Sequence, residues 1–274
     1  GNGMRRAPAI GHHHDLRKAK PNGEDGGSQR RRQGPPTESP ALLGAGAIAL
    51  ARGLPLVAVN HLEGHALSPR LGEEVAFPYL LLLVSGGHCQ FVLVEGVGRY
   101  HRMGSTIDDA VGEAFDKSAK ILGLGFPGGP QIDRWAATGE VTIDFPLGLT
   151  SAKDLQRHRF DFSFSGLKTA VLRHVKGERE AGRDIDPSDL AASFQEAIVD
   201  VQVTKTIGAA RDRRVETILL GGGVVANTRL RDRMEKAGAE AGFRVLFPSL
   251  DLCTDNGAMI AVAGSWRLLR GERT

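Results

Sequence analysis

The pattern of apolar and polar positions differs between two parts of this chain. Residues 1–40 show no recurring apolar spacing and are rich in Gly, Pro, Arg, Gln and Asp, a composition that buries too little surface to fold. From Ala41 onward, short apolar runs are interspersed with segments in which apolar residues recur at helical spacing. The chain is therefore expected to have a disordered basic head, residues 1–40, followed by a folded body.

The apolar pattern of the body predicts both strands and helices. The expected strands are Pro55–Asn60, Tyr79–Val84, Gln90–Glu95, Arg99–Met103, Phe160–Phe164, Val215–Leu220 and Arg244–Phe247. The expected helices are Ala41–Leu54, the segment of His61 and His65, Asp108–Leu122, Leu167–Val175, Pro187–Arg211, Asn227–Ala241 and Asp255–Leu269. Pro127-Gly128-Gly129-Pro130 is expected to break the chain. With 41% apolar residues and 36 glycines, the body fits an α/β protein with many tight turns.

Length and cysteine content set the broad class. The 274 residues suffice for one large domain or two modest ones with a real core. Cys89 and Cys253 lie far apart and in no C-x-x-C motif, which favours a reducing compartment over a disulfide scaffold. The longest apolar run, Tyr79–Val84, is too short to span a bilayer, and no signal-peptide pattern appears. A cytoplasmic protein without membrane contact is expected.

The positive charge of the chain is concentrated in the head. The whole chain has a formal charge of +3 and a pI near 9.0. Residues 1–40 hold eight Lys/Arg and four Asp/Glu, which leaves 27 basic and 28 acidic residues in the body. The high pI is therefore weak evidence that the body binds nucleic acid. For the head, a basic nucleic-acid tail and a segment without function both remain open.

The stretch Asn60-His61-Leu62-Glu63-Gly64-His65 carries the first candidate chemistry. If it is helical, His61 and His65 lie one turn apart on one face, where two imidazoles can bind one metal ion. Glu63 points away from that face, and the metalloprotease pattern H-E-x-x-H is absent. The alternative interpretation is that two polar side chains simply cap and solvate a helix.

Two buried strands are expected to run into glycine-rich turns, Ser85-Gly86-Gly87 and Gly221-Gly222-Gly223. Missing side chains let a ligand approach the backbone, and freed N–H groups can hold phosphate oxygens. Neither turn fits G-x-G-x-x-G or a Walker loop, and one such turn alone is better explained as a tight connection without a ligand. Two turns in a chain with a paired-histidine helix favour a nucleotide-sized ligand.

A third metal ligand could come from Asp255, which opens the last expected helix. From local sequence alone, its ordinary role would be that of an N-cap or first-turn acid. Two histidines and one carboxylate would instead bind a metal and leave positions open for a substrate. The local sequence leaves both interpretations open.

Seven motifs in chain order make the body similar to a known family. They are Asn60-His61-Leu62-Glu63-Gly64-His65, Leu83-Val84-Ser85-Gly86-Gly87-His88, Asp108-Asp109-Ala110-Val111-Gly112-Glu113-Ala114-Phe115-Asp116-Lys117, Pro127-Gly128-Gly129-Pro130, Phe162-Ser163-Phe164-Ser165-Gly166-Leu167-Lys168, Gly221-Gly222-Gly223-Val224-Val225-Ala226-Asn227 and Thr254-Asp255-Asn256. From about Ala41 to its end, the chain resembles the tRNA N6-adenosine threonylcarbamoyltransferase family (TsaD, formerly called O-sialoglycoprotein endopeptidase).

The resemblance implies a fold and a reaction. The fold is an actin-like ATPase (RNase H-like) fold of two α/β lobes with the ligand between them. The reaction is transfer of threonylcarbamoyl from threonylcarbamoyl-AMP to N6 of the adenosine 3′ of the anticodon, in tRNAs reading codons that begin with A (t6A modification). The implied partners are tRNA, threonylcarbamoyl-AMP and TsaB-like and TsaE-like subunits.

The resemblance also implies site residues. His61, His65 and Asp255 match the family's metal ligands, which bind iron or, alternatively, zinc. The positions that match the family's substrate-adenylate contacts are Leu83, Val84, Ser85, Gly86, Gly87, Asp116, Gly129, Asp133 and Asn227. No residue is assigned as general base.

The family normally begins with strands that carry a phosphate loop, and nothing similar precedes Ala41. The first lobe is therefore expected to be truncated. Residues 41–77 would be its remnant with the metal-binding helix, and residues 78–274 would be the second lobe, with the last helix returning toward the cleft. Loose docking of residues 41–77 and little transferase activity of this chain alone are expected. The alternatives are a metallopeptidase and a non-catalytic actin-like partner subunit.

Overall fold

The structure, a computed structural model, describes residues 40–272. The chain divides into two units, residues 1–52 and 53–274. The described part of the first unit is helix α1 (Pro40–Arg52), which confirms the helix expected over residues 41–54. The disordered head expected over residues 1–40 lies almost entirely outside the described residues.

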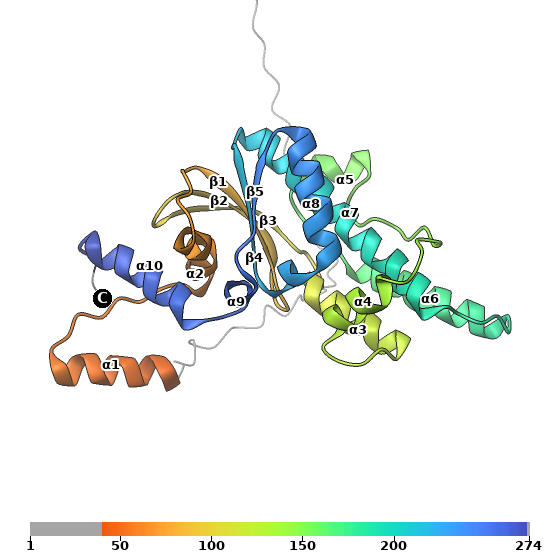
Figure 1. The fold of residues 1–274 in the computed structure, drawn as a ribbon, viewed down its shortest axis with the longest axis horizontal. Coiled ribbons are helices and arrows are strands. Elements are labelled where there is room, and N and C mark those ends of the chain that lie inside the picture. Colours follow the sequence, from red (N-terminus) through yellow and green to blue (C-terminus); the bar gives the residue numbers. More distant parts are fainter. Residues whose placement is uncertain (1–39, 273–274) are drawn as a thin grey trace, which may run out of the picture. The chain divides into compact units, whose positions relative to one another are not determined.

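A five-stranded sheet organises the second unit (Figure 1). Its strands are β1 (Tyr79–Val84), β2 (Cys89–Gly96), β3 (Arg99–Ser105), β4 (Thr217–Gly221) and β5 (Arg244–Leu246), in the order β3-β2-β1-β4-β5. The β1–β2 and β2–β3 pairs are antiparallel, whereas β1–β4 and β4–β5 are parallel. β1 is therefore central, and every one of its six residues is buried, as its unbroken apolar run predicts.

Alternate residues of β1 supply two separate cores. Leu80, Leu82 and Val84 pack with the buried side chains of five helices on one face. Tyr79 and Leu83 pack on the opposite face, which α2 covers. The five helices are α3 (Val111–Leu122), α4 (Gly128–Ala136), α6 (Ser165–Glu180), α7 (Pro187–Arg213) and α8 (Thr228–Ala241). The remaining elements are α2 (His61–Leu67), α5 (Ala152–Arg157), α9 (Leu250–Cys253), α10 (Gly257–Leu269) and the 3-10 turns η1 (Ser68–Leu71) and η2 (Gly223–Ala226).

Two of the expected strands are wrong. Residues 55–60 form no strand, because apolar residues in an extended segment become a strand only beside a partner that accepts their hydrogen bonds, and none of the described strands runs along them. Of the strand expected over residues 160–164, only one bridge between Thr106 and Phe162 forms. The remaining expected strands and helices form, with ends shifted by up to five residues.

The chain break expected at residues 127–130 is the start of α4. Pro127 has the extended backbone of an N-cap residue, and the Asp116 carboxylate accepts a hydrogen bond from the Gly128 N–H at 2.7 Å. A side chain at Gly128 would place its Cβ 2.6 Å from the Asp116 Cα, so only glycine fits this approach. The motif therefore ends one segment and starts a helix at the same point.

Helix α2 packs firmly within the second unit. Its residues Glu63–Leu67 are buried, and a Cβ at Gly64 would lie 3.1 Å from side-chain atoms of Met259 and Ile260 on α10. The loose docking expected of residues 41–77 is therefore not seen in α2. The lobe boundary at residues 77 and 78 stays a prediction. Within residues 40–272, no helix has both the length and the apolar character needed to cross a bilayer.

Candidate metal centre and adjoining glycine turns

Helix α2 places two imidazoles side by side, as the four-residue spacing predicts. The Asn60 side chain caps the helix by accepting a hydrogen bond from the Leu62 N–H at 2.9 Å, which fixes His61 as its first residue. The rings of His61 and His65 lie 4.8 Å apart, edge to face. The His65 side chain is only 3% exposed, whereas that of His61 is 45% exposed. One ligand is therefore anchored and the other faces solvent.

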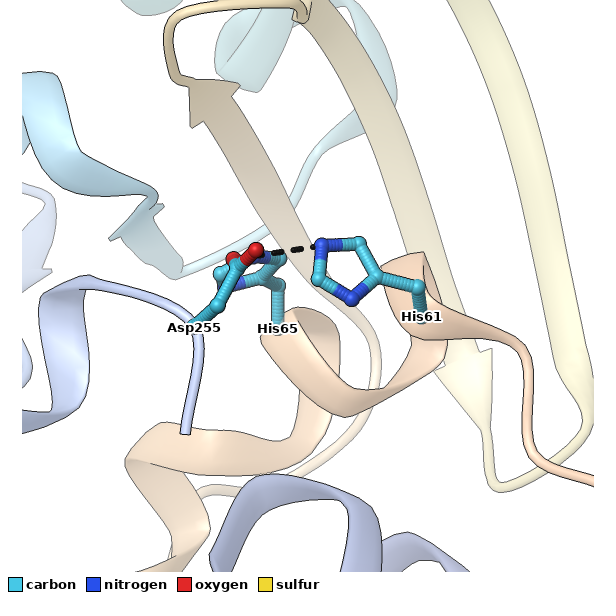
Figure 2. Close-up of side chains that lie close together, drawn as sticks. All are labelled: His61, His65 and Asp255. Atoms are coloured by element: carbon cyan, nitrogen blue, oxygen red, sulfur yellow. Dashed lines mark hydrogen bonds and ion pairs between the residues drawn. The ribbon is translucent and has the colours of Figure 1, made fainter. Parts of the chain in front are cut away.

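Asp255 completes a three-residue cluster (Figure 2). One carboxylate oxygen, Oδ1, lies 3.2 Å from His61 Nε2 and 3.0 Å from His65 Nε2. Asp255 is not the N-cap of α10, because the Asn256 side chain accepts the capping hydrogen bond from the Met259 N–H at 2.9 Å. The structure thus excludes the N-cap role for Asp255, and its carboxylate faces both histidines instead.

This cluster fits a divalent metal ion. Metal bonds of about 2.1 Å at tetrahedral angles would separate neighbouring ligand atoms by about 3.4 Å, close to the distances from the carboxylate oxygen to the two imidazole nitrogens. Burial and the adjacent His61 lower the pKa of His65, so its imidazole is neutral at neutral pH, the form that binds a metal. Two histidines and one carboxylate would leave positions open for water or substrate.

A buried polar network holds the two ligand-bearing segments together. Between the two histidines, Glu63 points to the opposite side of α2, as the sequence predicts, and only 2% of its side chain is exposed. Its Oε2 lies 2.9 Å from Arg267 Nη2 on α10, and its Oε1 accepts a hydrogen bond from the Tyr100 hydroxyl at 2.8 Å. Burial raises the pKa of Tyr100, so the hydroxyl stays a donor.

Sequence reasoning missed Arg267 and Tyr100. A signal was present for Arg267, because it lies four residues after Ala263 and eight after Met259, both buried on α10. An arginine on a buried face requires an acidic partner. Nothing in the sequence singled out Glu63 as that partner.

The two glycine turns adjoin each other and the metal cluster. Gly222 has a φ of 95°, and a Cβ there would lie 2.3 Å from the Val84 carbonyl oxygen, so the second turn presses against the end of β1. The next residue, Gly223, faces the side chain of Thr254, the neighbour of Asp255. The Ser85-Gly86-Gly87 turn is closed by a 2.7 Å hydrogen bond from the Ser85 N–H to the His88 carbonyl. The structure thus brings both predicted turns together beside the candidate metal ligands.

The predicted substrate contacts lie in β1, in these turns, and on or beside the neighbouring helices. Gly112 of α3 approaches the Ser85–Gly87 turn, since its N–H bonds the Ser85 carbonyl at 3.2 Å, and Asp116 lies one helical turn further along α3. On α4, Asp133 accepts a hydrogen bond from the Asn227 side chain at 3.2 Å. Asn227 also caps α8 through the Leu230 N–H at 2.9 Å. Leu83, Val84 and Gly86 belong to β1 and its turn, and Gly129 belongs to α4.

Residues of two motifs that carried no assigned role themselves, Asp108 and the serines Ser163 and Ser165, meet at the start of α3. The Asp108 carboxylate accepts hydrogen bonds from the Ser163 hydroxyl at 2.5 Å and the Ser165 hydroxyl at 2.7 Å. Burial alone would raise the pKa of Asp108, but these bonds and the backbone N–H of Phe164 outweigh it and lower the pKa. The neighbouring Asp109 lies 2.8 Å from the ammonium of Lys117. The carboxylates thus lock the segment before α6 onto α3.

Comparison with models of protein families shows which family the chain belongs to. The model of TsaD, tRNA N6-adenosine threonylcarbamoyltransferase, matches residues 41–262. The chain belongs to this family. One TsaD relative, from Maricaulis maris (strain MCS10), is 50% identical over 241 residues, which cover 85% of this chain and 62% of the relative. Another, from Thiobacillus denitrificans (strain ATCC 25259 / T1), is 49% identical over 241 residues, covering 86% of this chain and 68% of the relative. The chain thus spans about two thirds of the length of these TsaD proteins.

Solved structures support the fold class that the TsaD resemblance implied. The crystal structure of T. kodakarensis HypF superposes with a TM-score of 0.64 at 15% identity, over 83% of this chain and 39% of that one. Full-length HypF in its phosphate- and nucleotide-bound form gives a TM-score of 0.62 at 13% identity, over 82% of this chain and 38% of that one. At such identities the likeness concerns the fold alone. The α/β, actin-like class expected from the sequence is thereby confirmed.

Proposed function

We propose that this chain provides the catalytic part of a tRNA N6-adenosine threonylcarbamoyltransferase. The reaction transfers threonylcarbamoyl from threonylcarbamoyl-AMP to N6 of the adenosine 3′ of the anticodon, in tRNAs reading codons that begin with A. One observation carries the proposal. In a chain of the TsaD family, His61, His65 and Asp255 converge at the point where both glycine turns meet.

His61, His65 and Asp255 would hold one divalent metal ion, iron or alternatively zinc. Such an ion, when bound, acts as a Lewis acid that polarises a carbonyl or phosphoryl oxygen. The chain's own residues serve to position it. α2 fixes both imidazoles, while the pairing of Glu63 with Arg267 holds α10 and the Asp255 segment against α2.

Threonylcarbamoyl-AMP would lie over the two glycine turns. A mixed anhydride is already activated, so the protein has to bind it, orient it and stabilise charge on its phosphate. Gly86 and Gly129 have no protein atom within 4 Å of the place where a Cβ would stand, which leaves room for a ligand against the backbone. Asp116, Asp133 and Asn227 supply polar atoms on the neighbouring helices for the nucleoside.

The structure argues against the metallopeptidase alternative. That chemistry needs a carboxylate beside the metal-bound water. Glu63, the only acid inside the histidine pair, is buried on the opposite side of α2 against Arg267 and Tyr100. A non-catalytic partner subunit would have no use for a convergent metal cluster and is the weaker alternative. Cytoplasmic location and assembly with TsaB-like and TsaE-like subunits belong to the same proposal.

Metal and adenylate binding test the proposal on this chain directly. The protein should bind about one metal ion per chain by elemental analysis, and it should bind threonylcarbamoyl-AMP in calorimetry. His61→Ala should remove most of the metal without unfolding the protein, because the His61 side chain is 45% exposed. His101→Ala, an exposed histidine on β3, is the matched control and should retain the ion. Full metal retention in His61→Ala would rule out the site.

The transfer reaction is tested with tRNA, threonylcarbamoyl-AMP and the partner subunits, with the modified nucleoside as readout. A low rate is expected of this chain, and the metal-depleted His61→Ala variant should give still less product. Product at an equal rate from both proteins would contradict a role for the cluster in the reaction.

A further inference from the structure

Phe126 is exposed to an unusual degree for a phenylalanine. It lies in the connection between α3 and α4, and 80% of it is accessible to solvent. Within residues 40–272, the other Phe, Tyr and Trp side chains are buried or at most 37% exposed. Phe126 belongs to neither apolar core. Its ring therefore contributes little to folding and is available for binding.

The ring forms one wall of a cavity of about 550 Å³. The other lining residues are Asp116, Lys117, Lys120, Gly123 and Gly125. Lys117 is already paired with Asp109 at 2.8 Å and with Glu113 at 2.7 Å. Lys120 is exposed and has no hydrogen-bond or ion-pair partner among residues 40–272, so its charge is available to a ligand. The cavity thus combines an aromatic face with an unpaired cation.

This cavity lies next to the proposed adenylate site. Asp116 borders the cavity while its carboxylate holds the Gly128 N–H at 2.7 Å, so the start of α4 and the cavity share one residue. Along α3, Asp116 is four residues, or about 6 Å, from Gly112, which contacts the Ser85–Gly87 turn. The cavity and the Ser85–Gly87 turn therefore border the same helix, and their nearest residues on it, Asp116 and Gly112, are about one helical turn apart.

We propose that this cavity binds an unpaired nucleotide of the tRNA substrate, with its base stacked on Phe126 and a phosphate beside Lys120. This inference rests on the proposed function. Proteins that recognise single-stranded RNA loops stack splayed bases on exposed aromatic rings and neutralise the backbone with nearby cations. The acceptor adenosine lies next to the anticodon, so one of its loop neighbours has to be held close to the donor.

The anticodon loop is a better occupant than a protein partner. An apolar protein contact would cover the ring with further apolar residues, but the cavity rim carries Asp116, Lys117 and Lys120. The size of the cavity falls in the range of small-ligand sites, about 300–1,000 Å³, and suits one nucleotide.

The test measures RNA binding by the full chain together with its partner subunits. The probe is an anticodon stem-loop RNA with 2-aminopurine in the loop, whose fluorescence reports stacking. Phe126→Ala should weaken binding about 5- to 100-fold, the loss expected for one stacked base, whereas Phe126→Trp should preserve it. Lys120→Gln should weaken binding and reduce the salt dependence by about one phosphate contact. Leu172→Ala, another exposed apolar residue, is the control and should bind normally.

Melting temperature and adenylate affinity show whether Phe126→Ala affects only the cavity. Both should be unchanged in Phe126→Ala, because the ring supports no core and its loss leaves the glycine turns intact. Equal RNA affinity of wild type and Phe126→Ala, or no RNA binding by the wild-type assembly, would overturn the inference. Selective loss of a partner subunit from Phe126→Ala would assign the surface to a protein instead. Failure of the proposed function is a different result, namely a wild-type protein that binds neither metal nor adenylate.

Discussion

Replacing Arg267 with methionine tests how α2 and α10 are held together. Arg267 is the only cation within salt-bridge distance of Glu63 among residues 40–272, and its Nη1 also donates to the Ala58 carbonyl at 3.1 Å. Methionine keeps most of the volume and the flexible stem but removes the charge. The Glu63 carboxylate, 2% exposed, would then remain buried beside an apolar side chain and the Tyr100 hydroxyl.

The magnitude follows from this burial. Removing one partner of a buried ion pair typically costs about 3–5 kcal/mol, because the remaining charge is desolvated without compensation. The hydrogen bond from Tyr100 persists, so we expect a loss near the lower end, about 3 kcal/mol. For a folded region of this size each kcal/mol shifts Tm by about 2–4 °C, which gives a fall of about 6–12 °C. Glu63→Gln combined with Arg267→Met should recover much of this loss, because both charges are then absent.

Thermal melting and metal titration measure the two consequences. Arg267→Met should also weaken metal binding about 10- to 100-fold, as changes to groups that hold metal ligands in place commonly do. Arg244→Met is the matched control: it breaks the exposed pair with Glu73, 52% and 43% exposed, and should cost less than about 1 kcal/mol. If Arg267→Met melts and binds metal like Arg244→Met, the buried network does not hold the site together.

Two further predictions concern the glycine turn and the acid limb of stability. Gly86→Val should weaken threonylcarbamoyl-AMP binding about 10- to 100-fold, because the side chain would block backbone N–H groups from a charged phosphate. Its Tm should be nearly unchanged, because a Cβ at Gly86 meets no protein atom within 4 Å. Unchanged affinity by calorimetry would refute this placement. The lowered pKa of Asp108 stabilises the fold at neutral pH, and this stabilisation is lost as pH falls below about 4 through its folded-state pKa. Asp108→Asn should therefore be less stable than wild type at pH 7 and approach the stability of wild type in acid. If the difference in urea midpoint between the two proteins is the same at both pH values, Asp108 is not the source of this stabilisation.

The fold was predictable wherever one element's own residues decide its state. β1 forms over the predicted six residues because an unbroken apolar run suits a strand buried on both faces. The segment 55–60 looks equally strand-like, but its state depends on a partner strand that the local pattern cannot supply. The start of α4 was missed because Pro-Gly-Gly-Pro carries helix-breaking residues. Only the distant Asp116 carboxylate shows that a helix begins there.

In the candidate site too, local sequence predicted some features, whereas others depend on residues far away in the sequence. The four-residue spacing placed His61 and His65 on one face, and α2 has them there. Local sequence could not choose between Asp255 and Asn256 as the cap of α10, because both side chains can accept the capping bond. Arg267 and Tyr100 were missed because their role exists only through Glu63, which lies far away in the sequence.

The separation between the candidate metal ligands has a consequence for the order of events during synthesis. His65 and Asp255 are 190 residues apart, and both histidines leave the ribosome long before the aspartate does. A nascent chain that exposes only α2 offers two imidazoles without the third ligand, and such a pair binds a transition-metal ion only weakly. The third ligand, Asp255, can join the histidines only after the sheet, including β4, and the segment before α10 have formed. Metal retention would thus report that translation has passed Asp255 and that the C-terminal segment has folded back onto α2.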